Sequence, residues 1–149
     1  MPQSRLSPDD GSAALEFITA GMLLLIPLVY LVLVMAALQG GALSVEGASR
    51  QAARVFVQAP DGGSAQTRAT TAVDFALHDF GLGKSPSRMT VMCRPNPSAC
   101  LTRRAFVTIT VTANVPLPLV PNVLALKTPL SVPITATSTE QVSRFWGAG

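Results

Sequence analysis

The sequence predicts a membrane-anchored α+β protein with one long amino-terminal helix. Three patterns support this fold class. A run from Phe17 to Val45 has no charged side chain, two later segments repeat apolar residues at helical spacing, and after Pro86 apolar residues alternate with threonines. We expect a spanning helix that continues into an amphipathic helix, then a second helix and a small antiparallel sheet. The length of 149 residues fits about one domain.

The charge-free run fits a transmembrane helix. A helix over residues 17–38 is about 33 Å long, close to the thickness of the hydrocarbon core of a bilayer. Pro27 lies inside it, and spanning helices tolerate proline, which bends them. A cleaved secretory signal is the alternative, with Gly40 and Ala42 as a small-x-small pair. It is disfavoured because the apolar core is longer than usual and only Arg5 is basic before it.

The orientation of the span is predicted from the lengths of the segments on either side of it more than from their charged residues. Arg5 precedes the span whereas Arg50 and Arg54 follow it, a count that weakly favours an extracytoplasmic amino terminus. However, the first 11 residues are too few to fold, and long carboxyl-terminal domains cross largely regardless of charge. We therefore expect a cytoplasmic leader at 1–11, a span at 12–38 in the plasma membrane and an extracytoplasmic remainder.

Two helices are predicted outside the bilayer. Residues 39–59 are amphipathic, and Glu46 precedes Arg50 at the favourable i,i+4 spacing. The apolar face of this segment consists of Val45, Ala48, Ala52, Val55 and Phe56. Gly40 and Gly41 are interpreted as a flexible joint. The second helix lies within residues 64–81 and ends at Gly81, a typical carboxyl-terminal cap.

The remainder of the 60–149 domain predicts three strands, at 89–93, 105–115 and 129–142. The middle segment places Val107, Ile109 and Val111 on one side and threonines on the other, as in a half-buried antiparallel strand. Pro133 indicates that the last strand lies at an edge. The proline-rich segment 116–121 is predicted to be a loop or an edge crossing.

Cys93 and Cys100 flank a segment of turn-forming residues, Pro95, Asn96 and Pro97. Two ligands are too few for a structural zinc site, which needs four. A disulfide suits a domain outside the cytoplasm, and two unpaired thiols are the alternative.

No pattern indicates catalysis, a cofactor or a metal, so we expect a non-enzymatic protein. The single histidine, His78, is interpreted as a surface residue. "GLGKS" at 81–85 has a histidine where a phosphate loop needs its first glycine, and "DFG" at 79–81 lacks the other kinase motifs. The basic residues are scattered despite a net charge of +3, which argues against nucleic-acid binding.

Glu16 is the one charged residue at the start of the apolar run. The helix dipole explains why an anion is tolerated there, but not why it follows Gly11 by five residues. Gly11, Glu16 and Phe17 resemble the prepilin-peptidase site of type IV pilin-like proteins of the tight-adherence (Tad/Flp) subgroup. "GASRQAARVF" resembles the helix of TadE-like minor pilins, and "VPLPLVP" and "VPITATSTEQVSRF" resemble their actinobacterial branch.

This resemblance, which runs from about residue 9 to the carboxyl end, implies a pilin-like fold and cleavage between Gly11 and Ser12. It also implies the partners: a prepilin peptidase, other pilins or pseudopilins, and the assembly platform in the membrane. The freed amine, mostly protonated near neutral pH, would pair with Glu16 of a neighbouring copy. Because major pilins of the subgroup are very short, this longer chain resembles a minor, initiating or tip component. Such a component either enters the filament or stays in the membrane as an assembly factor, and both alternatives are open at this point.

Two other functions remain open at this point. The first is an uncleaved, single-pass anchor for an extracytoplasmic binding domain. The second is a membrane-tethered hydrolase, for which the sequence supplies few candidate groups.

Overall fold

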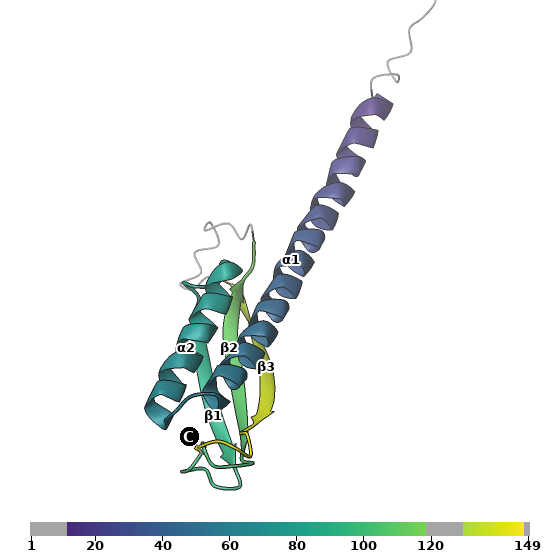
Figure 1. Ribbon diagram of the computed structural model, residues 1–149. Coiled ribbons are helices and arrows are strands. Elements are labelled where there is room, and N and C mark those ends of the chain that lie inside the picture. Colours follow the sequence, from purple (N-terminus) through teal and green to yellow (C-terminus); the bar gives the residue numbers. More distant parts are fainter. Residues whose placement is uncertain (1–11, 119–129, 148–149) are drawn as a thin grey trace, which may run out of the picture. The chain divides into compact units, whose positions relative to one another are not determined.

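The computed structural model describes residues 12–118 and 130–147, and these ranges contain two helices and three strands (Figure 1). They are α1 (Ser12–Val57), α2 (Gly62–Asp79), β1 (Ser87–Arg94), β2 (Phe106–Pro116) and β3 (Ser131–Gln141). The predicted order and type of the elements are confirmed. The chain divides into two units, 1–35 and 36–149, which are described separately.

The first unit contains the apolar part of α1. Its large side chains are exposed, among them Phe17, Leu24 and Ile26, and Pro27 is inside the helix. The Thr19 hydroxyl donates to the Leu15 carbonyl at 2.7 Å, so this polar group is satisfied within the helix. By length and composition, α1 is able to cross a membrane.

In the second unit, α1 packs through the face that its sequence predicts. Val45, Ala48, Ala52 and Phe56 are buried, whereas Glu46 and Arg50 form an ion pair on the exposed side.

The interpretation of Gly40 and Gly41 as a joint is wrong, because α1 is helical through both residues. Gly41 instead lies close to the sheet: a β-carbon there would collide with Cγ2 of Val115. The glycine at position 41 is explained by this close approach rather than by flexibility.

Both ends of α2 are capped by specific contacts. At the amino end, the Asp61 carboxylate accepts a hydrogen bond from the Ser64 backbone N–H at 2.8 Å. At the carboxyl end, Gly81 has a φ of +74°, and its N–H donates to the His78 carbonyl at 2.9 Å. The Leu82 N–H donates to the Leu77 carbonyl at 2.8 Å. These two bonds form the Schellman motif, which confirms Gly81 as the cap.

Helix α2 contributes a buried stripe to the core that it shares with α1 and the sheet, and one side-chain hydrogen bond joins it to α1. Its buried residues are Ala65, Ala69, Val73 and Leu77. The buried Ser44 of α1 donates its hydroxyl to the Ala76 carbonyl of α2 at 3.1 Å. This bond satisfies a polar group in the core and fixes the two helices against each other.

The strands form one antiparallel sheet in the order β1-β2-β3, so β3 is an edge strand, as Pro133 predicts. One face of β2 is fully buried and belongs to the core shared with both helices. It consists of Val107, Ile109, Val111, Ala113 and Val115. The helices therefore cover one face of the sheet (Figure 1). Of the predicted 116–121 loop, Pro116 is the last residue of β2, and 119–121 lie outside the described residues.

The carboxyl-terminal segment closes this unit against the α1–α2 connection. The Trp146 indole N–H donates to the Ala59 carbonyl at 3.1 Å, and the Arg103 Nε–H donates to the Trp146 carbonyl at 3.1 Å. Residues far apart in the chain are thus tied together at one end of the sheet.

Candidate functional site

The candidate processing site lies at the amino end of α1. Gly11 and the rest of the leader, 1–11, lie outside the described residues. Ser12 begins α1, and Glu16 follows it one helical turn later. Both Glu16 and Phe17 are exposed, the latter with 79% of its surface accessible. The structure therefore places Glu16 on the helix surface, among exposed apolar side chains.

The chemistry of this site is that of a single carboxylate. An ionised Glu accepts hydrogen bonds but donates none, and it is costly to place in hydrocarbon without a cation. Within the described part of the chain, Glu16 makes no salt bridge. The site therefore presents one carboxyl group among exposed apolar side chains.

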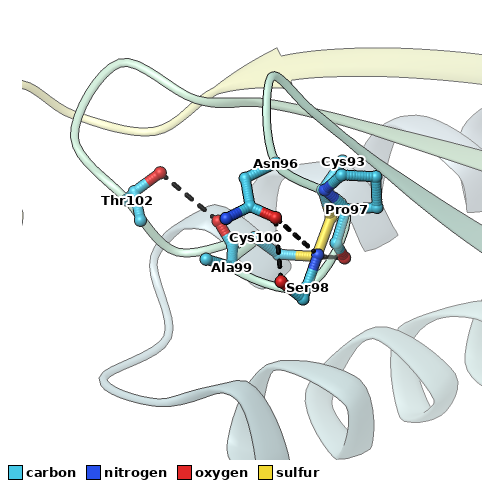
Figure 2. The surroundings of a disulfide bond; sticks show 7 residues. All are labelled: Cys93, Asn96, Pro97, Ser98, Ala99, Cys100 and Thr102. Atoms are coloured by element: carbon cyan, nitrogen blue, oxygen red, sulfur yellow. Dashed lines mark hydrogen bonds between the residues drawn. A yellow bond between two sulfur atoms is a disulfide. The ribbon is translucent and has the colours of Figure 1, made fainter.

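The predicted disulfide between Cys93 and Cys100 is confirmed. Cys93 is at the end of β1 with 2% of its surface exposed. Figure 2 shows how Asn96 organises the turn: its Oδ1 accepts from the Ser98 N–H at 3.1 Å and from the Ser98 hydroxyl at 2.8 Å. The Thr102 hydroxyl donates to the Ala99 carbonyl at 3.3 Å just beyond the bridge. The bridge and these bonds together hold the turn.

The described residues were also compared with what a metal site, a histidine site or a binding groove would need. The described residues contain no group of three or more His, Cys, Asp or Glu that is placed to hold a metal ion. His78 is exposed on α2, as predicted. A groove of about 570 Å³ between α1 and α2 is lined by residues that include Gln51, Val55, Arg68 and Phe75. Hydrogen bonding from the Ser64 backbone lowers the pKa of Asp61, the helix cap.

Sequence reasoning missed the pairing of threonines on the sheet face opposite the core. Three threonines of β2 face three of β3, and each pair joins its hydroxyls by a hydrogen bond: Thr108–Thr139, Thr110–Thr137 and Thr112–Thr135. The alternation in "TITVT" and "TATST" is a visible signal for this face. The register that pairs the hydroxyls is not visible in the sequence.

Comparisons with family models, curated proteins and solved structures gave no match for this chain.

Proposed function

We propose that this chain is a minor pilin or pseudopilin, a non-enzymatic component in the assembly of a tight-adherence (Flp-type) pilus. The observation that carries the proposal is Glu16, exposed near the start of a long apolar helix that leads into a small α+β unit. The motif resemblance at Gly11, Glu16 and Phe17 supports the same function.

In this proposal α1 anchors the protein in the plasma membrane, with residues 1–11 cytoplasmic and residues 60–149 extracytoplasmic. The length and apolar composition of α1 support the anchor. A prepilin peptidase then cuts between Gly11 and Ser12, which creates a new α-amine at the end of the helix.

The new amine gives Glu16 a partner. Ser12 and Glu16 are four residues apart, so they are separated by about 6 Å along the helix axis. A neighbouring copy displaced by about that distance brings its ammonium level with Glu16. Removing one member of a buried ion pair is strongly destabilising, so mispaired registers are disfavoured. Glu16 thereby selects the stagger between packed helices.

The folded unit that follows explains why the component is a minor one. It has its own core, disulfide and two-layer architecture, features that suit an initiating or tip subunit more than a short repeating one. Its partners are other pilins or pseudopilins and the assembly platform in the membrane.

The alternative is an uncleaved single-pass anchor that presents the same unit to an envelope partner. Deleting the gene in its native host distinguishes the minor pilin from the uncleaved anchor. Surface pili of the deletion strain are counted by electron microscopy. The proposal predicts few or no Flp-type pili, restored by the full chain. Normal pilus number and length in the deletion strain would favour the uncleaved anchor.

A further inference from the structure

The sheet face opposite the core carries threonines at regular, alternating positions of two strands. On the side away from the core, β2 contributes Thr108, Thr110 and Thr112, and β3 contributes Thr135, Thr137 and Thr139. All six are exposed or half-buried, and no described helix packs on them. We call this surface, together with the β1 residues in register with it, the threonine face.

The hydroxyls of the threonine face are held in place by one another. The three cross-strand pairs have oxygen–oxygen distances of 2.9, 3.0 and 2.9 Å. Each pair uses one of its two hydroxyl hydrogens, which leaves the other hydrogen and several lone pairs for a ligand. Successive pairs are about 7 Å apart because side chains on one face of a strand recur every second residue.

Positive charge borders this face along β1. Arg88 is in register with Thr112, and Arg94 is in register with Phe106. Both arginines are exposed, and no strand residue on this face is Asp or Glu. The two arginines are six residue steps apart along β1, a distance of about 20 Å. A single small anion cannot contact both, whereas a chain with repeated anionic groups can.

We propose that the threonine face binds a carboxylate-bearing polysaccharide. The carboxylates pair with Arg88 and Arg94, since guanidinium and carboxylate form charge-assisted, bidentate hydrogen bonds. The sugar hydroxyls exchange hydrogen bonds with the threonine pairs, whose positions are fixed before binding. Phe106, in register with Arg94 and half exposed, offers a sugar ring an apolar surface at one end.

The composition of the face favours a glycan over an acidic protein. Protein interfaces concentrate their energy in large aromatic and arginine anchors at the centre. Here the centre is made of threonines, while Met92, Phe106 and the two arginines lie at the margins, with Met92 on the edge strand β1. A partner rich in hydroxyls matches that centre better than a polypeptide does.

The inference concerns a binding activity of the folded unit and does not depend on cleavage or pilus assembly. It is tested with the full chain in detergent micelles. The probe is fluorescent polygalacturonate fragments, and its methyl-esterified form and poly-glutamate serve as comparison ligands. We expect polygalacturonate to bind, with weaker binding as salt increases, and the two comparison ligands to bind at least several-fold more weakly.

Two pairs of substitutions locate the site, and a third pair serves as the control. Arg88→Gln with Arg94→Gln should weaken polygalacturonate binding about tenfold, because two exposed ion pairs are lost. Thr110→Val with Thr137→Val keeps the side-chain shape but removes the central hydroxyl pair, and should weaken binding several-fold. Arg54→Gln with Arg68→Gln, on the helices, removes the same charge and should leave affinity unchanged.

Four results would overturn the inference. They are no binding by the wild-type chain, unchanged binding by the Arg88/Arg94 variant, equal weakening by the Arg54/Arg68 control, and equal affinity for either comparison ligand. Tight binding of poly-glutamate in particular would mean that the surface recognises acidic polypeptide. Circular dichroism of every variant confirms that the sheet is folded.

Discussion

Gly41 of α1 lies so close to Val115 of β2 that a β-carbon at position 41 would collide with Cγ2 of Val115. Such a β-carbon would also lie 3.4 Å from Cδ1 of Ile134 in β3. A β-carbon added at the adjacent Gly40 would have no neighbouring side chain or other element within 4 Å. Two neighbouring glycines therefore play different roles, and only one of them determines how closely the helix approaches the sheet.

This difference predicts opposite effects of two alanine substitutions. Gly40→Ala should stabilise the fold by about 0.5–1 kcal/mol, because alanine favours a helix interior. Gly41→Ala should destabilise it by about 1–3 kcal/mol, because the added methyl group overpacks the helix–sheet contact. Thermal unfolding followed by circular dichroism in one detergent compares them. Equal melting temperatures for the two variants would contradict the close approach.

The disulfide predicts a loss of stability on removal of either sulfur. Cys93→Ser should lower the free energy of unfolding by about 2–3 kcal/mol, the usual range for opening a short loop. Reductant should lower the melting temperature of the wild-type protein but not that of the variant. If reductant leaves the wild-type melting temperature unchanged, the bridge contributes nothing to stability.

The Asp61 cap predicts a dependence of stability on pH. Its pKa is lowered mainly because the Ser64 backbone N–H donates a hydrogen bond to the carboxylate. Because folding lowers the pKa of Asp61, the ionised carboxylate stabilises the folded state. This stabilisation is fully present above the pKa of the unfolded chain, about 4 for Asp. It is lost as the pH falls through the still lower pKa of the folded state.

Asp61→Asn keeps the acceptor oxygen but does not titrate, so it should flatten the acid limb of a plot of melting temperature against pH. Asp61→Ala should lower the melting temperature at neutral pH by a few degrees, because the cap is lost. Asp74→Asn, exposed in the middle of α2, removes the same charge without touching the cap. An acid limb that stays unchanged in Asp61→Asn would show that the cap does not control it.

The proposed pairing of Glu16 predicts an assembly defect without an insertion defect. Glu16→Ala should leave the protein in the membrane fraction but reduce the number of surface pili. Glu46→Ala provides the matched control, because it removes a glutamate from the exposed side of the same helix. Pilus counts by electron microscopy and blots of membrane fractions measure both effects. Normal piliation with Glu16→Ala would exclude the pairing.

The sequence predicts the order and type of the elements because their signals are local. Apolar spacing separates helices from strands, Gly81 indicates the end of α2, and Pro133 indicates an edge strand. The boundaries shift by one or two residues in the structure, as is usual at element ends. The disulfide was also predictable, because a short turn-forming segment separates the two cysteines.

Features that depend on distant neighbours were not predictable. The role of Gly41 requires knowing that Val115 lies opposite it. The paired hydroxyls of Thr110 and Thr137 depend on the β2–β3 register, which alternation alone does not determine. The residues around Glu16 form a local sequence pattern, whereas the proposed partner of Glu16 belongs to another copy of the chain.

We propose that cleavage after Gly11 supplies the cation for Glu16 of a neighbouring copy. Intact mass measurement of the protein purified from its native membrane, in cells with an active prepilin peptidase, shows whether this cleavage occurs. We expect a chain that lacks residues 1–11 and begins at Ser12. A chain that retains residues 1–11 would contradict it, because the partner amine would never form.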